Sequence, residues 1–591
     1  MSDAASRIVE LVRSGDLAGA EAAGEAALRD VPDDFAARAA LANLRAMKGD
    51  LEGAEALCIG DSPELLRLKA WLLQSRGRNG EAADCYARIV AADPADWEMW
   101  NNLGNARHAG GDLEGAIEAL GRARRLRPDM APIQLNYAML AAAAGRLEES
   151  VEAYEAVARL EPDNPIVPLE LGRARAGLGR MDEAESAYRR AVGLAPGLAI
   201  AWLELGIVLE RANRIDRLEP LLAEARSQGI AADELAYLEA LLLREQGRTE
   251  EALALARRAP ADVEPARRAL LIGRLADSLG DSGAAFEAFA EANRIAAGEP
   301  AAARADPEAY RRRVAAMTAR LTPEWLAGWT PVEPGSRPAP VFLVGFPRSG
   351  TTLLDTVLMG HPAVAVLEEE PILERVDAAA GGLDGLADLD SAATERLRDL
   401  YFAEAERLVP DLGGRTLIDK LPLNLLAQPL IRRLFPEARI VFALRHPCDV
   451  VLSCFMQSFE INDAMANFLD LADSARLYDL VLAFDRRCRE VLALEAHTVR
   501  YEALVEDLEG EARALLYFLG LPWDPAVLDH RRTARARGTI STPSYSQVIR
   551  PIYREASGRW ERYRAQMAPV LPLLAPWAIR LGYGDILEAG R

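Results

Sequence analysis

GFPRSGTTLLDTVL occupies residues 345–358 and directly follows the short apolar run PVFLV of residues 340–344. Two glycines five positions apart, Gly345 and Gly350, are followed by the hydroxyl pair Thr351 and Thr352. This spacing between a strand and a helix is typical of a loop that binds a phosphate group with its backbone N–H groups. The stretch therefore predicts an α/β domain with an anion site at the end of its first strand.

The side chains of this loop argue against a nucleotide kinase or a nucleoside triphosphatase. Thr351 stands where the P-loop of such enzymes carries lysine, and no clear acidic magnesium ligand follows downstream. Arg348 contributes a permanent positive charge from within the loop. We expect a phosphate-containing donor that is bound without metal by five loop residues: Arg348, Ser349, Gly350, Thr351 and Thr352.

After residue 340 the chain alternates short β-branched runs with helical stretches. The runs VFLVG, RTLID, RIVFAL and HTVRY predict buried parallel strands. The Pro/Gly-rich stretch TPVEPGSRPAP at residues 330–340 has the composition of a linker. We predict a linker region at residues 300–338 and an α/β P-loop-type domain at residues 339–591, with ligands at the carboxyl ends of the strands.

The first half of the chain contains an internal repeat. Pro94, Pro128, Pro162 and Pro196 are each 34 residues apart, and glycines at 77, 111, 145 and 179 keep a fixed offset from them. WNNLGNARHAGGDLEGAIEALGRARRLRP (residues 100–128) resembles the tetratricopeptide repeat almost position for position. Roughly nine such repeats, some of them degenerate, predict an all-α superhelix over residues 1–299.

Such a superhelix has a concave groove, which can hold an extended peptide, while the repeats can also serve only as a scaffold or a dimer surface. Asn102 and Asn136 occupy the same repeat position, on the helix that usually lines the groove. Two asparagines can pair with a peptide backbone whatever its side chains are. We predict a protein or peptide acceptor as the partner, with Asn102 and Asn136 as contacts and a homodimer as a further option.

Composition narrows the class of protein. The 591-residue chain has a formal net charge of −21, which argues against general binding to nucleic acid or to an anionic membrane. Five scattered cysteines without metal-ligand spacing favour a reducing compartment. The N-terminus has no basic start followed by an apolar core, and no apolar run approaches the roughly 20 residues that span a bilayer. We expect a cytoplasmic protein without a bound metal.

A second basic element follows the run RIVFAL. Arg445 comes at the end of this predicted strand and Ser453 eight residues later, so that the two can hold one phosphate from two sides. FPRSGTTLL together with this arginine–serine spacing resembles the sulfotransferase family. The resemblance implies the donor 3′-phosphoadenosine 5′-phosphosulfate, with its 5′-phosphosulfate end at the first motif and its 3′-phosphate at the second.

Further motifs resemble the tyrosylprotein sulfotransferases from about residue 339 onward. These are HPAVAVLEEE (361–370), IDKLPLN (418–424), VRYEAL (499–504) and STPSYSQVIRPIYREASGRW (541–560). By this resemblance Glu369 is the catalytic base, while Lys420 and Ser544 assist the transfer. Further contacts to the donor carry over to Tyr501, Gln547, Arg550 and Arg559.

The acceptor is less well defined by the sequence. Glu370 and Pro371 replace family residues that help to hold acidic peptides, and Gln457 replaces an arginine on the phosphate side. The leading interpretation is sulfuryl transfer to a protein tyrosine that the repeats recruit. A carbohydrate or small-molecule acceptor stays open, as does a non-catalytic repeat scaffold. For residues 368–370, a solvated helix start is the alternative to a catalytic role.

Overall fold

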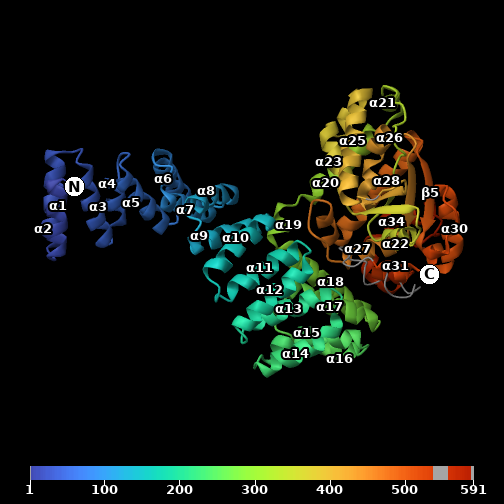
Figure 1. Ribbon diagram of the computed structural model, residues 1–591, viewed down its shortest axis with the longest axis horizontal. Coiled ribbons are helices and arrows are strands. Elements are labelled where there is room, and N and C mark those ends of the chain that lie inside the picture. Colours follow the sequence, from blue (N-terminus) through green and yellow to red (C-terminus); the bar gives the residue numbers. More distant parts are fainter. Residues whose placement is uncertain (1, 262, 411, 537–556, 588–591) are drawn as a thin grey trace. The chain divides into compact units, whose positions relative to one another are not determined.

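The computed structural model describes residues 2–261, 263–410, 412–536 and 557–587 of a chain that divides into two compact units, residues 1–238 and 239–591. Figure 1 shows helices throughout the first unit, and a sheet flanked by helices in the second. The prediction of an all-α repeat part followed by an α/β domain with a parallel sheet is confirmed. No helix in the described residues is long and apolar enough to cross a membrane.

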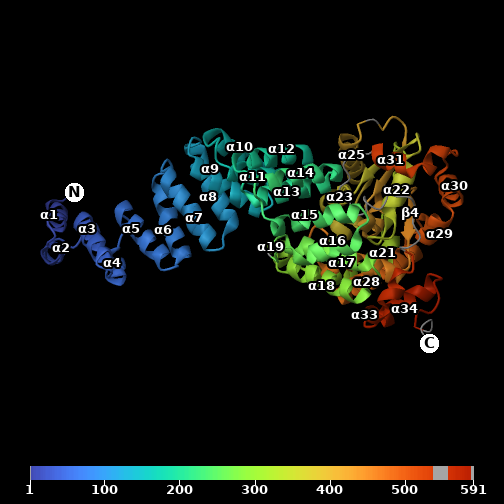
Figure 2. The ribbon, with the colours of Figure 1, turned by 90° about the horizontal axis from the view of Figure 1, so that it is seen from below.

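Helical hairpins make up the first unit, and Figure 2 shows them following one another from the N-terminus. The helices are α1 (Asp3–Arg13), α2 (Leu17–Asp30), α3 (Phe35–Met47), α4 (Leu51–Leu57), α5 (Pro63–Ser75), α6 (Asn79–Ala92), α7 (Trp97–Ala109), α8 (Leu113–Leu126), α9 (Ala131–Ala143), α10 (Leu147–Leu160), α11 (Ile166–Gly177), α12 (Met181–Leu194), α13 (Ala199–Arg211), η1 (Ile215–Arg217), α14 (Leu218–Ser227) and α15 (Ala232–Glu245), the last of which crosses the boundary between the units.

The 34-residue period sets where these helices end and how closely they pack. The turn glycines Gly77, Gly111, Gly145 and Gly179 have φ angles of 73°, 87°, 77° and 75°, which favour glycine and end the first helix of each hairpin. Within a hairpin, a Cβ atom added to Gly104 would lie 2.6 Å from Leu120 Cγ. The small residue at this position therefore allows α7 and α8 to pack closely.

A parallel sheet of five strands, counted over the described residues, forms the centre of the second unit, in the order β2-β3-β1-β4-β5. The strands are β1 (Val341–Gly345), β2 (Val364–Glu368), β3 (Thr416–Lys420), β4 (Arg439–Leu444) and β5 (Glu495–Arg500). The helices are α16 (Thr249–Arg258), α17 (Pro265–Ser278), α18 (Ser282–Ala297), α19 (Pro300–Arg304), α20 (Pro307–Arg320), α21 (Pro323–Ala327), α22 (Thr351–Met359), α23 (Ile372–Ala380), α24 (Gly382–Gly385), η2 (Leu386–Asp388), α25 (Ser391–Leu408), η3 (Pro422–Ala427), α26 (Gln428–Leu434), α27 (Pro447–Phe455), η4 (Met465–Leu469), α28 (Leu471–Val491), α29 (Tyr501–Glu506), α30 (Leu508–Leu519), η5 (Pro525–Leu528), α31 (His530–Ala536), η6 (Arg559–Tyr563), α33 (Arg564–Met567) and α34 (Leu571–Arg580).

Apolar helices cover both faces of the sheet. Successive side chains of a strand point to opposite faces, so alternate residues of β1 pack into different clusters. Val341 and Leu343 of β1 belong to a core cluster that includes apolar residues of α22 and α30. Phe342 and Val344 belong to a second cluster with residues of α25, α28 and α34. All five residues of β1 are buried, which explains why the predicted strand is apolar throughout.

The helices that precede the sheet contribute to the same core. Ala285 and Phe289 of α18 and Val314 of α20 are buried in the cluster that contains Phe342. Phe286 of α18 stacks on Phe455 with ring centroids 4.9 Å apart. The second compact unit thus begins well before the sheet and includes helices of both the predicted repeat part and the predicted linker region.

The sheet has one strand more than the four predicted runs. Those runs correspond to β1, β3, β4 and β5, whereas VAVLE at residues 364–368 forms the edge strand β2. The run is short and leads directly into three glutamates, so that its periodicity gives little indication of a strand. Its parallel pairing brings Glu368 next to Lys420 of β3.

Asp419 of β3 lies on the face of the sheet opposite to that of Lys420, where it accepts hydrogen bonds from Tyr401 Oη at 2.8 Å and Asn424 Nδ2 at 3.1 Å. Burial raises the pKa of Asp419 from 3.8 to about 7. The folded-state pKa of Asp419 lies above the unfolded one, so its protonated form favours the folded state. This contribution of Asp419 to the free energy of unfolding is complete below about pH 4 and is lost as the pH rises through about 7.

We therefore expect the melting temperature of Asp419→Asn to rise relative to that of the wild type between about pH 4 and about pH 7, because asparagine stays neutral. Thermal unfolding of both proteins across this range measures the difference. The matched control is Asp399→Asn, which removes an exposed carboxylate of α25. A difference in melting temperature that does not change with pH would contradict the raised pKa.

Candidate functional site

The phosphate-loop candidate lies between β1 and α22, and its backbone has an unusual conformation. Arg348 and Gly350 have φ angles of 71° and 100°. For a residue with a side chain, such a conformation costs on the order of 1–3 kcal/mol and is found mostly at functional sites. A Cβ atom at Gly350 would lie 2.8 Å from Tyr501 Cδ2. Glycine therefore lets the tyrosine ring pack directly on the loop.

The other loop residues lie where a helix begins. Thr351 and Thr352 form the first positions of α22 and are buried, with exposed fractions of 3% and 5%. The backbone N–H groups of a first helical turn have no acceptor within the helix and favour an anion. Ser349 Oγ is buried and has no hydrogen-bond partner among the described residues. The loop thus offers several donors at the carboxyl end of β1.

The two predicted phosphate-binding elements meet in space. Arg348 Nε donates to Ser453 Oγ at 3.1 Å, and Arg445 Nη1 donates to the carbonyl oxygen of Arg348 at 3.3 Å. The guanidinium carbon of Arg445 lies 4.7 Å from the centroid of the Tyr501 ring. Four predicted donor contacts, which lie after β1, after β4, in α27 and in α29, are therefore neighbours, although they are up to 153 residues apart in sequence (501 minus 348).

Lys420 lies at the end of β3 with its ammonium group among three carboxylates. Its Nζ is 2.7 Å from Glu369 Oε1, 3.1 Å from Asp355 Oδ2 and 3.6 Å from Glu368 Oε1. The side chains of Lys420 and Asp355 are completely buried. Burial by itself lowers the pKa of Lys420, but the carboxylates outweigh it and leave the pKa above its ordinary value of 10.5. The lysine is therefore a cation at neutral pH.

Glu369 and Glu368 differ in their access to this cation. Glu369 has a φ angle of 53°, and its N–H donates to the carbonyl oxygen of Lys420 at 2.7 Å. Its side chain forms the shorter contact with Lys420 and is 31% exposed, whereas that of Glu368 is 20% exposed. Residues 368–370 form the end of β2 and the turn before α23 rather than a helix start. Glu369 can therefore contact both the lysine and a molecule from solvent.

Arg559 binds a carboxylate that the sequence did not indicate. Its Nη2 and Nε donate to Asp277 of α17 at 2.5 and 3.3 Å. The charges of Arg445 and Arg559 both act on Asp449 of α27 and lower its pKa, although burial is the largest influence and leaves that pKa above its ordinary value. Arg559 thus lies near the second basic element.

Several predicted residues are not at this site as far as the structure describes them. Ser544, Gln547 and Arg550 lie outside the described residues. Asn102 and Asn136 are half-buried on α7 and α9 of the first unit. Their proposed roles stay predictions.

Two carboxylates of the site, Asp355 and Asp449, were missed by sequence reasoning. Each is an acid within an otherwise apolar helical run, TTLLDTVLM for α22 and PCDVVLSCF for α27, and each is almost completely buried. A charged residue on a buried helix face requires a partner. The position of each aspartate in an apolar run could therefore have indicated that it binds a cation or a hydrogen-bond donor.

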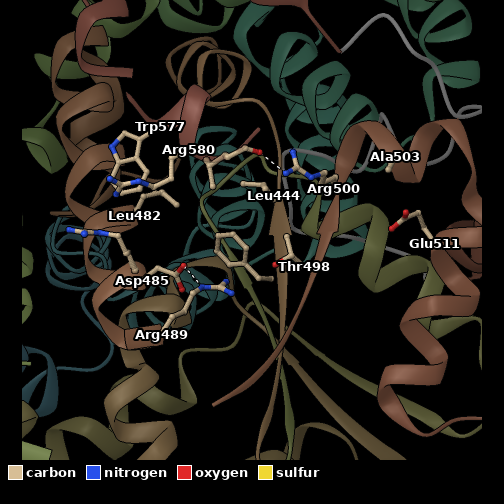
Figure 3. Close-up of a pocket in the computed structure, with 13 residues that line it drawn as sticks. Leu444, Leu482, Asp485, Arg489, Thr498, Arg500, Ala503, Glu511, Trp577 and Arg580 are labelled. Atoms are coloured by element: carbon tan, nitrogen blue, oxygen red, sulfur yellow. Dashed lines mark hydrogen bonds and ion pairs between the residues drawn. The ribbon is translucent and has the colours of Figure 1, made fainter. Parts of the chain in front are cut away.

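A separate cleft of about 440 Å³ lies beside the edge strand β5. Arg489, Arg500 and Arg580 are among the residues that line it, and Figure 3 shows Arg489 turned toward Asp485, 2.7 Å away. None of the predicted site residues lines this cleft. This cleft and the cluster of charged side chains at the strand ends are therefore different places.

Within the described residues, no group of three or more histidine, cysteine, aspartate or glutamate side chains is arranged to hold a metal ion. Besides the carboxylates around Lys420, the site offers the guanidinium groups of Arg348 and Arg445, hydroxyls and backbone N–H groups. This set suits an anionic substrate.

Comparison with known proteins matches a family model to each part of the chain. Residues 340–525 match the model of the sulfotransferase family. Residues 7–58, 67–131, 109–165, 135–199 and 169–233 match a tetratricopeptide repeat model. Among solved structures, that of YrrB, a TPR protein with an unusual peptide-binding site, matches with a TM-score of 0.28 and 18% identity, over 30% of this chain and 95% of that one.

Curated relatives match the C-terminal region. An uncharacterized protein of Aquifex aeolicus is 28% identical over 248 residues, which are 40% of this chain and about a third (32%) of that protein. Protein-tyrosine sulfotransferase 1 of Danio rerio is 29% identical over 269 residues, 41% of this chain and 72% of the enzyme. Protein-tyrosine sulfotransferase 2 of Gallus gallus is 28% identical over 261 residues, with coverages of 41% and 69%. The chain thus carries tetratricopeptide repeats followed by a sulfotransferase-family domain, and protein-tyrosine sulfotransferases are homologues of its C-terminal region.

Proposed function

We propose that the protein transfers a sulfuryl group from 3′-phosphoadenosine 5′-phosphosulfate to an acceptor hydroxyl, with a protein tyrosine as the acceptor. The observation that carries this proposal is the buried Lys420 ammonium, 2.7 Å from Glu369 and 3.1 Å from Asp355 beside a phosphate loop. In-line sulfuryl transfer resembles phosphoryl transfer and needs a base for the acceptor and positive charge near the leaving group. Glu369 and Lys420 have these properties.

The two anionic ends of the donor have separate candidate contacts. Arg348 and the N–H groups at the start of α22 suit the 5′-phosphosulfate, because Asp355 of the same helix binds Lys420. Arg445 and Ser453 suit the 3′-phosphate, as the family resemblance implies. The direct Arg348–Ser453 contact makes both ends parts of one site. Ser544, Gln547 and Arg550 remain predicted contacts.

The reaction follows from these positions. Glu369 takes the proton of the acceptor hydroxyl as its oxygen forms a bond to sulfur. The bond between sulfur and the bridging oxygen of the donor breaks, and 3′-phosphoadenosine 5′-phosphate leaves. An ammonium group has three N–H donors. Glu369 and Asp355 lie within 3.1 Å of the Lys420 ammonium group and Glu368 lies 3.6 Å away, so we propose that one of its N–H groups turns to the departing oxygen when the donor binds and stabilises its negative charge.

The choice of a protein tyrosine as the acceptor rests on the homologues named protein-tyrosine sulfotransferases. The tetratricopeptide repeats supply a second reason, because a bound protein would present its tyrosine at a raised effective concentration. A carbohydrate or small molecule is the alternative acceptor, which Glu370 and Pro371 favour because they replace residues that hold acidic peptides in the family.

Donor binding is the first expected outcome. Calorimetry should detect binding of 3′-phosphoadenosine 5′-phosphate in the presence of EDTA and none of ATP. Arg445→Ala should weaken this binding by about 10- to 100-fold, because a charge-assisted hydrogen bond is lost. The control Arg439→Ala removes an arginine from the other end of β4 and should leave the affinity unchanged. Tight binding of ATP that depends on magnesium, without binding of the bisphosphate, would contradict the assignment of the donor.

Catalysis is tested by transfer of labelled sulfate to tyrosine peptides, glycans and phenols. Glu369→Gln should lower turnover by about 10²- to 10⁴-fold, the usual contribution of a positioned general base, and should keep donor affinity. Glu368→Gln is the matched control, because its carboxylate is adjacent but 3.6 Å from Lys420. Equal effects of the two substitutions, or a larger effect of Glu368→Gln, would show that Glu369 is not the base.

Recruitment by the repeats is tested in the full chain. Asn102→Ala combined with Asn136→Ala should raise the apparent KM for a protein acceptor and leave that for a small phenol unchanged. Asn43→Ala is the control, because this exposed amide donates within its own helix to the carbonyl oxygen of Ala39. A second measurement uses a chain without residues 1–238, which spares the helices α17 and α18 that belong to the catalytic core. Equal KM values for the protein acceptor in all of these variants would contradict recruitment.

A further inference from the structure

Asp277, near the end of α17, binds three side chains that lie more than 280 residues later in the chain. It accepts from Arg559 Nη2 at 2.5 Å, from Tyr563 Oη at 2.6 Å and from Arg562 Nη2 at 3.3 Å. Asp277 is 13% exposed and Tyr563 is completely buried. One carboxylate of the predicted repeat part therefore fixes the whole of η6.

The same segment is held from its other side by the second basic element. The N–H groups of Gly558 and Trp560 each donate to Asp449 at 2.8 Å. The Trp560 ring stacks on that of His446, the residue after Arg445, with centroids 5.3 Å apart and 13° between the ring planes. Arg559 is thus held between α17 and the start of α27, next to the proposed phosphate contact Arg445.

The geometry of the Arg559 guanidinium leaves part of it available. Its Nε and Nη2 point to Asp277, whereas Nη1 has no partner among the described residues. A guanidinium group has five N–H donors in a rigid plane, so that one edge can bind a carboxylate while the other binds a phosphate. An arginine fixed in this way loses less freedom when an anion binds.

We propose that Asp277 is a positioning residue for the donor, which it serves by holding Arg559 in place beside Arg445. The proposal rests on the proposed function and deepens it. The last repeat-like hairpin, α17 and α18, then belongs to the donor site itself. Asp277 acts through Arg559 and touches no substrate.

The direction in which Asp277→Asn changes donor affinity separates a positioning role from simple charge balance. If Asp277 only compensated the positive charge of Arg559, its neutralisation would strengthen the binding of an anion. If Asp277 positions Arg559, Asp277→Asn leaves the arginine mobile, and binding weakens by about 3- to 10-fold, the cost of immobilising one side chain. Asp277→Glu keeps the carboxylate and should restore part of the affinity.

The experiment measures the dissociation constant of 3′-phosphoadenosine 5′-phosphate by calorimetry in full-length protein, together with the KM values for donor and phenol. Asp277→Asn should raise the dissociation constant of the bisphosphate and the KM for the donor. It should leave the KM for phenol and the kcat at saturating donor unchanged. Arg559→Gln should weaken donor binding further, and the double variant should have the same donor affinity as Arg559→Gln alone. Glu287→Gln, which removes an exposed carboxylate of α18, is the control and should match the wild type.

Each other result has a defined meaning. Unchanged or tighter donor binding by Asp277→Asn, additive effects in the double variant, or normal binding by Arg559→Gln would overturn the positioning role while the wild type still transfers sulfate. A wild type that neither binds the bisphosphate nor transfers sulfate would instead overturn the proposed function. Should Asp277→Asn fail to fold, Tyr563→Phe removes one hydrogen bond to the same carboxylate and keeps both arginines. It should weaken donor binding in the same direction, and unchanged binding would overturn the role.

Discussion

A buried ammonium group remains charged only if carboxylates surround it, and the site of this protein depends on that constraint. Lys420 has Asp355, Glu368 and Glu369 within 3.6 Å, and its pKa is raised although it is fully buried. Asp355 lies in α22, which begins at the phosphate loop, Glu368 ends β2, and Glu369 directly follows it. The strand order and the position of α22 are therefore coupled to the charge that the proposed transfer requires.

Much of the fold could be predicted from local sequence. The 34-residue period and the apolar strand runs each reflect a strong physical requirement, close helix packing in one case and burial on both faces in the other. The loop residues and the pair of Arg445 and Ser453 could also be proposed as site residues from the sequence, because a phosphate loop needs glycine, hydroxyl and cationic groups at fixed spacing. Their meeting through the Arg348–Ser453 contact is a consequence of β1 and β4 being neighbours.

The remainder depends on tertiary contacts that no local pattern expresses. β2 is a short edge strand, and the partners of Lys420 become evident only once β2 and α22 are placed beside β3. From sequence alone, Asp277 would be taken for an exposed acid on a repeat helix. In the structure it binds Arg559 of η6, 282 residues later in the chain. The boundary of the second compact unit could not be predicted for the same reason, since α17 and α18 have repeat periodicity and still contribute to its core.

The most direct test of a single site built from loop, arginines and buried lysine is a crystal structure of the protein with 3′-phosphoadenosine 5′-phosphate. We predict that the 5′-phosphate binds at the N–H groups of residues 348–352, within hydrogen-bond distance of Lys420 Nζ. We predict the 3′-phosphate between Arg445 and Ser453, with Arg559 beside it. A nucleotide bound in the cleft that Arg489 and Arg580 line, or one whose 5′-phosphate lies out of reach of Lys420, would contradict the account.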